Sequence, residues 1–180
     1  REFFFVSNLS HFAKGIRRGD PEAEIIAGKF SGGDPGLIRA FMAAGLGEWM
    51  DILDVHTYSN DPRIGLDMGG VVASHETLEE LGQGEKTIYL GEGWGPTRNL
   101  HQWARLEHDE PVAFEEADFM RQFFWNGYRT LVTPREDYNP EWMHGARFFT
   151  LNDNLGMTYW SVNAVPHYNE VGEIDYYLLS

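Results

Sequence analysis

The sequence predicts an α/β fold in which helices cover a mainly parallel sheet. Segments whose apolar side chains recur every three or four residues, as in helices, alternate with short apolar runs of strand length. Gly, Pro, Asp and Asn residues separate these segments, and no sequence repeat interrupts the alternation. Units of strand, helix and strand form parallel sheets, which are either doubly wound or closed as a (β/α)8 barrel.

The first half of the chain predicts two helices and two strands. A turn at Gly19-Asp20-Pro21 ends the first helix. Asp34 followed by Pro35 is an N-cap with proline in the first turn, which begins the second helix. In order, we expect a helix at 3–16, a strand at 24–29, a helix from 34 with its apolar stripe at 37–42, and a strand at 52–56.

The second half continues the same alternation as far as residue 151. Gly82-Gln83-Gly84 separates a helix from the third strand, and Asn152-Asp153-Asn154 ends the fourth strand. The expected elements are a helix at 71–81, a strand at 87–90, a helix at 114–126 and a strand at 147–151. We expect the tail to residue 180 to be loop with one short strand near Tyr176.

Composition limits the class of protein. The 180 residues are 42% hydrophobic and 14% aromatic, which suits one domain or part of a larger one. The 28 acidic and 14 basic side chains give a formal net charge of −14, which argues against nucleic acid or an anionic membrane as a partner. The absence of cysteine excludes disulfides, thiolate metal sites and thiol catalysis. With no signal peptide and no membrane-spanning apolar run, the location stays open between secreted and cytoplasmic.

Polar residues directly follow each expected strand, and this favours the barrel. In a parallel barrel the carboxyl ends of all strands meet on one face, where active sites lie. Four strands that supply four polar groups suit such convergence better than a single crevice in a doubly wound sheet. The polar residues are Lys29 and Ser31, His56 and Tyr58, Glu92, and Asn152 and Asp153.

Glu92 is the strongest candidate for chemistry. It ends an apolar strand between two glycines and precedes Trp94, whose flat face suits stacking on a sugar. A carboxylate in such a place costs stability unless it is paired or used. The alternative is a structural Glu paired with Arg98. The glycines do not form a phosphate-binding loop, because Glu92 stands where the phosphate would go and no Lys-Ser/Thr pair follows.

Other candidates are less specific. His56 and Tyr58 are two residues apart and share a face of an extended strand, where they either bond to a carboxylate or a substrate hydroxyl or simply pack in the core. Asp54 shares a strand face with His56 and is either a partner of His56 or a residue that begins the strand, and we favour the second interpretation. Asn152 indicates a turn or a substrate contact, and Trp160 is a sugar platform or a core residue. The seven histidines show no metal-ligand spacing, so we expect no metal and no cofactor.

Four passages of the sequence resemble, in order, the barrel strands five to eight of the clan A glycoside hydrolases, which are retaining (β/α)8-barrel enzymes. The passages are 19–28, 50–58, 86–93 and 145–153. The passage 50–58 carries their His-x-Tyr ending, and Glu92 occupies the place of their nucleophile. The resemblance implies a carbohydrate substrate. It also implies that His56 and Tyr58 orient Glu92 or touch the substrate, and that Trp94, Asn152 and Trp160 contact it.

The acid/base Glu of this family follows an Asn at the end of strand four. No Asn-Glu pair lies near the start of this chain, and the pair Asn169-Glu170 lies in the tail. We therefore expect residues 1–180 to be the C-terminal half of one catalytic domain, irregular from about residue 155, with the acid/base upstream of Arg1. A half barrel has two open sheet edges and an exposed inner apolar face, so a missing N-terminal half or a second chain should complete it.

The leading hypothesis is retaining hydrolysis of glycosidic bonds in an oligo- or polysaccharide. The alternative is a non-catalytic carbohydrate-binding barrel or fragment that keeps the aromatic platforms. A third interpretation, a different barrel enzyme with Glu92 as general base, would need a metal or a lysine, for which Lys29 is the single candidate.

Overall fold

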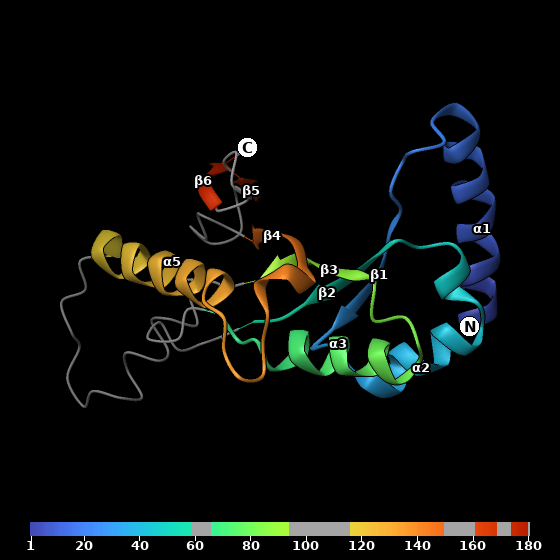
Figure 1. Ribbon diagram of the computed structural model, residues 1–180, viewed down its shortest axis with the longest axis horizontal. Coiled ribbons are helices and arrows are strands. Elements are labelled where there is room, and N and C mark those ends of the chain that lie inside the picture. Colours follow the sequence, from blue (N-terminus) through green and yellow to red (C-terminus); the bar gives the residue numbers. More distant parts are fainter. Residues whose placement is uncertain (59–65, 94–115, 150–160, 169–173, 180) are drawn as a thin grey trace.

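A computed structural model describes residues 1–58, 66–93, 116–149, 161–168 and 174–179 (Figure 1). Helices and strands alternate along this part of the chain. The elements are α1 (Glu2–Gly19), β1 (Ile26–Ser31), α2 (Pro35–Ala43), the short 3-10 helix η1 (Leu46–Glu48), β2 (Ile52–His56), α3 (Gly69–Glu80), β3 (Thr87–Gly93), α5 (Glu116–Val132), the 3-10 helix η2 (Pro140–Trp142), β4 (Met143–Phe149), β5 (Ser161–Tyr168) and β6 (Ile174–Leu179).

The six strands form one sheet in the order β1-β2-β3-β4-β5-β6. Strands β1 to β4 are parallel to one another. Strands β5 and β6 continue the sheet and pair antiparallel, β5 with β4 and β6 with β5. Each parallel strand therefore lies beside the preceding one. Successive right-handed crossovers in one direction place their helices on the same face, and Figure 1 shows α2 and α3 along one side of the sheet. The fold is α/β with a four-stranded parallel sheet, which is compatible with half of a barrel.

The hydrophobic core lies between this sheet and the helices. One row of register partners across the four parallel strands is buried, and it consists of Phe30, Val55, Leu90 and Ala146. Helices α2 and α3 complete the core with Ile38 and Leu78, both 0% exposed. The expected N-cap also forms, since the Asp34 side chain accepts hydrogen bonds from the backbone N–H groups of residues 36 and 37.

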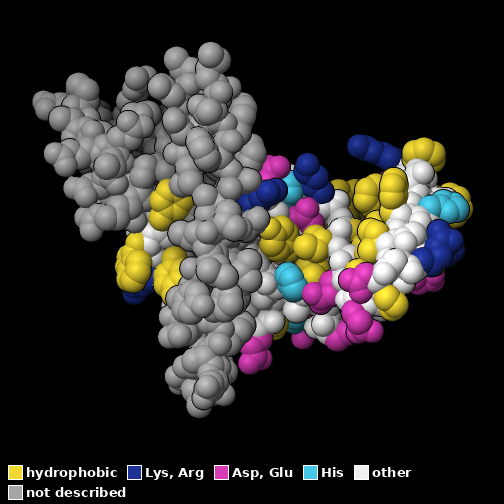
Figure 2. All heavy atoms as spheres, turned by 90° about the horizontal axis from the view of Figure 1, so that it is seen from above, with side chains coloured by type: hydrophobic (Ala, Val, Ile, Leu, Met, Phe, Trp, Pro, Cys, Tyr) yellow, Lys and Arg dark blue, Asp and Glu magenta, His cyan; other side chains and the backbone are white. Residues whose placement is uncertain are grey.

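The opposite face of the sheet carries polar side chains. The next row across the strands consists of Gly28, Asp54, Tyr89 and Gly145, and toward the carboxyl ends His56 is the register partner of Glu92. The expectation of an apolar inner face is therefore wrong for this part of the sheet, although Ile26 and Ile52 stand at the amino ends of their strands. Seen from above, this face shows acidic, basic and histidine side chains gathered over the middle of the molecule (Figure 2).

The tail differs from its prediction, because it contains two strands rather than one. Strand β5 pairs with β4 and covers Ser161–Tyr168, where Pro166 and three polar positions hide the strand pattern. Strand β6 includes the short strand expected near Tyr176. In the described helices, no stretch is both long enough and apolar enough to cross a membrane.

An ion pair and a ring stack connect the helices to neighbouring segments. The Arg17 guanidinium of α1 binds both carboxylate oxygens of Asp51 at 2.7 and 2.9 Å, and the backbone N–H of Ile25 donates to Asp51 at 2.8 Å. Burial alone would raise the pKa of Asp51, but these hydrogen bonds hold it below its usual value. On α3, the buried His75 ring stacks on Trp142 at 3.7 Å between centroids, and burial lowers the pKa of His75.

Candidate active site

Glu92 lies at the carboxyl end of β3 and has two polar neighbours from β2 and the residues after it. The Tyr58 hydroxyl donates a short hydrogen bond to Glu92 Oε2. Nδ1 of His56 lies 3.5 Å from the same oxygen. These three side chains come together because β2 and β3 are parallel neighbours, so that their carboxyl ends lie at one edge of the sheet.

The favoured interpretation of Asp54, a residue that begins the strand, is wrong, and the alternative, a partner of His56, agrees with the structure. Asp54 lies inside β2, with Oδ2 3.6 Å from His56 Nε2 and Oδ1 accepting a hydrogen bond from the Gly91 backbone N–H at 3.0 Å. The imidazole of His56 therefore lies between two carboxylates, one on each ring nitrogen. The i,i+2 spacing of Asp54 and His56 indicated this alternative, since it places both side chains on one face of a strand.

A bulge in β3 makes this arrangement possible. His56 pairs with Glu92, whereas Val55 pairs with Leu90, so Gly91 is an extra residue in β3. A Cβ atom on Gly91 would lie 2.1 Å from Asp54 Oδ1. Glycine at this position therefore lets the Asp54 carboxylate approach the backbone closely and turns Glu92 toward the polar face.

Burial shifts the titration of the groups around Glu92. Burial raises the pKa of Tyr58, and the hydrogen bond to Glu92 together with the negative charge of that residue raises it further. Tyr58 therefore stays a protonated donor throughout the neutral range. Burial also raises the pKa of Asp54, against the opposing effects of His56, the Gly91 N–H and Lys29. On the same face, burial raises the pKa of Tyr89.

A second bulge lies at the carboxyl end of β1. Gly28 pairs with Asp54 and Phe30 pairs with Val55, so Lys29 is the extra residue of β1. Lys29 has φ of 64°, which places a non-glycine residue in the left-handed region. The bulge brings Phe30 into the core row and leaves the Lys29 side chain exposed.

The remaining predicted site residues lie outside the described part of the chain. They are Trp94, Asn152 and Trp160, and Arg98, the alternative partner of Glu92, lies there too. Within the ranges that the structure covers, no group of three or more His, Asp or Glu side chains has the arrangement of a metal site.

Comparison with protein-family models, with curated proteins and with solved structures finds no match to this chain. The polar edge of the sheet is therefore interpreted from its own geometry. It offers a carboxylate with an OH donor and an imidazole beside it, at the carboxyl ends of parallel strands, which is an arrangement suited to nucleophilic or acid–base chemistry.

Proposed function

We propose that the chain is the C-terminal half of a (β/α)8 barrel that hydrolyses glycosidic bonds with retention, and that Glu92 is the nucleophile. The observation that carries this proposal is the Tyr58–Glu92 hydrogen bond at the carboxyl end of the third parallel strand. A hydroxyl that donates to a carboxylate stabilises its ionised form, which is the form that attacks carbon. Nδ1 of His56 lies 3.5 Å from the same oxygen.

In the proposed reaction, a carboxylate oxygen of Glu92 forms a bond to the anomeric carbon. The bond from that carbon to the leaving-group oxygen breaks, and this oxygen keeps the electron pair and takes a proton from an acid/base carboxyl group. Water then gives a proton back to the same group and attacks the anomeric carbon, which releases the sugar and frees Glu92. The two carboxyl groups of retaining enzymes stand about 5–5.5 Å apart. In this proposal the acid/base belongs to a strand that pairs with β1.

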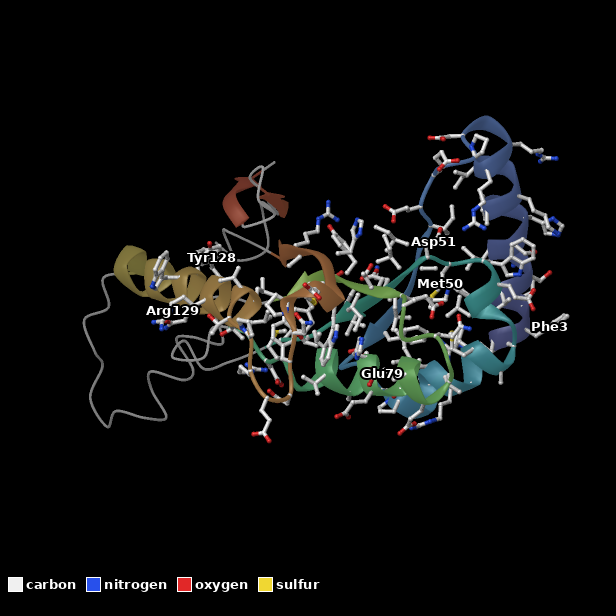
Figure 3. All side chains as sticks on the ribbon, viewed as in Figure 1. Phe3, Met50, Asp51, Glu79, Tyr128 and Arg129 are labelled. Atoms are coloured by element: carbon white, nitrogen blue, oxygen red, sulfur yellow. The ribbon has the colours of Figure 1, made fainter. Side chains whose placement is uncertain are left out.

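Three features near β1 support a partner at this edge. Strand β1 is the end strand of the described sheet, so one edge has no strand beside it. Helix α1 exposes Phe3, Phe4 and Phe12 by 77%, 75% and 70%, and Figure 3 shows Phe3 at its outer side. A cavity of about 440 Å³ opens between α1, α2 and the end of β1. Preceding strand–helix units, or a second chain, would cover this apolar surface of α1.

Substrate contacts complete the proposal. The site binds one sugar over Glu92, with His56 and Tyr58 beside it, and Trp94, Asn152 and Trp160 remain predicted substrate contacts.

The test uses glycosides with a 2,4-dinitrophenolate leaving group. This anion leaves without a proton, so the first step depends on Glu92 and not on an acid/base group. Glu92→Gln should lower the rate by several orders of magnitude, whereas the control Glu24→Gln, an exposed carboxylate before the amino end of β1, should leave it unchanged. Azide added to Glu92→Ala should restore turnover and give a glycosyl azide of inverted configuration.

Retention of more than about a tenth of the wild-type rate in Glu92→Gln would contradict the nucleophile role, since a tenfold change corresponds to only about 1.4 kcal/mol. Binding of sugars without any turnover of the activated substrates would favour the alternative, a non-catalytic carbohydrate-binding protein.

A further inference from the structure

Two basic side chains lie within the four parallel strands, and the proposed reaction uses neither of them. They are Lys29 on β1 and Arg147 on β4. The two acidic side chains of these strands, Asp54 and Glu92, lie on the strands between them. The two strands that carry the carboxylates thus lie between two strands that each carry a positive charge.

Lys29 is exposed, and its left-handed backbone costs stability that a glycine would not lose. It lies close enough to Asp54 to affect the titration of that carboxyl group. Nevertheless, no carboxylate of the described chain lies within 4 Å of its ammonium group, and both oxygens of Asp54 already face other groups, Gly91 N–H and His56. The charge of Lys29 is therefore available to a bound anion.

Arg147 stands on β4, which pairs with β3 on the side away from β2. Its neighbours Ala146 and Phe148 pair with Leu90 and Gly93, so Arg147 stands opposite residues 91 and 92. Alternation along β4 places it on the face opposite the buried Ala146. Its Nε is buried and has no hydrogen-bond partner among the described residues, and no carboxylate there forms an ion pair with it. Among these residues the Nε–H is left to donate to a bound group, and a guanidinium is the group best shaped to bind a carboxylate.

We propose that Lys29 and Arg147 form a receptor for a carboxylate on the substrate, and that the sugar bound over Glu92 is a uronic acid. This inference rests on the proposed glycoside hydrolase function. Adjacent strands are about 4.8 Å apart, so Arg147 is one strand and Lys29 two strands from Glu92. In this proposal both long side chains extend toward a sugar ring held over Glu92. With a net charge of −14, the protein as a whole repels anions, so an anionic substrate needs such a local positive site.

The experiment compares matched pairs of 2,4-dinitrophenyl 2-deoxy-2-fluoro-glycosides on the full chain. The members of a pair, a glucuronide with a glucoside and a galacturonide with a galactoside, differ only at C6, which is a carboxylate or a hydroxymethyl group. Glu92 oxygen bonds to the anomeric carbon, dinitrophenolate leaves with the electron pair, and intact mass gives the rate of labelling. We expect the uronide of at least one pair to label the wild type at least tenfold faster than its neutral partner.

Variants identify the source of this preference. Lys29→Met keeps the length and the backbone requirement of the side chain, and Lys29→Arg restores the charge. Lys29→Met and Arg147→Met should each slow labelling by the uronide tenfold or more and change labelling by the neutral sugar less than threefold. Lys29→Arg should recover most of the uronide rate, and Arg18→Met, an exposed cation on α1, should behave as wild type. Circular dichroism checks that each variant is folded.

The outcomes separate the two proposals. Labelling of Glu92 by neutral sugars as fast as by uronides, or equal slowing of both by Lys29→Met and Arg147→Met, overturns the carboxylate receptor and leaves the hydrolase proposal standing. No labelling of Glu92 by any glycoside of the set overturns both. If Arg147→Met does not fold, the Lys29 variants alone distinguish these outcomes.

Discussion

Replacement of Tyr58 by Phe removes one hydroxyl and leaves the ring in place. In the wild type this hydroxyl donates to Glu92 Oε2, and burial together with the Glu92 charge raises the pKa of Tyr58, so the donor is present at every working pH. Hydrogen bonds to charged groups contribute about 1.5–3 kcal/mol. Because Tyr58 is 38% exposed, water compensates part of the loss, and we expect a value near the lower limit.

An interaction of about 1.4 kcal/mol corresponds to a tenfold change in rate. The hydroxyl positions the Glu92 carboxylate for attack, so its loss should slow labelling by an activated 2-fluoro glycoside at pH 7 by about tenfold. Tyr128→Phe, which removes a hydroxyl on α5, serves as the control (Figure 3). A labelling rate of Tyr58→Phe within about threefold of the wild type, with the fold intact, would refute the role of Tyr58 as a donor to a reacting carboxylate.

Three further predictions concern stability, measured by urea unfolding. Gly91→Ala should lower the free energy of unfolding by about 1–3 kcal/mol, because the new Cβ displaces Asp54; an unchanged midpoint would contradict the contact. Arg17→Met should lower the free energy of unfolding by about 1 kcal/mol at pH 7. Because the pKa of Asp51 is lowered in the folded state, this difference from the wild type should vanish as the pH falls below about 4. The pKa of His75 is lowered in the folded state, so the unfolded chain binds a proton first as the pH falls, and the free energy of unfolding decreases below about pH 6.5. His75→Phe should remove this pH dependence. An unaltered pH profile of stability in His75→Phe would contradict the role of His75.

Most of the fold follows from local pattern. The run at 52–56 becomes β2 with the same bounds, the helix expected at 71–81 becomes α3, and Asp34-Pro35 begins α2. These features depend on side-chain period and on capping chemistry, both of which a short stretch of sequence contains. Strand β5 was missed because its pairing partner is β4, and a strand of mixed polarity with Pro166 is defined by that pairing rather than by its own composition.

The sequence predicted which residues form the site, but not all of the contacts between them. Tyr58 and Glu92 were selected from their places after two strands, and the parallel register of β2 and β3 explains why they meet. The role of Asp54 depends on the bulge at Gly91, and the exposure of Lys29 depends on the bulge in β1. Bulges arise from how two strands fit together, so a single sequence does not reveal them.

The most direct test of the hydrolase proposal is the position of the trapped sugar. The full chain is treated with activated 2-deoxy-2-fluoro glycosides, digested with pepsin and mapped by mass spectrometry. We expect one modified peptide, with the sugar on Glu92 and none on the nearby Asp54. A sugar attached to another residue, or no attached sugar after reaction with neutral and uronic glycosides alike, would contradict the assignment of Glu92 as the nucleophile.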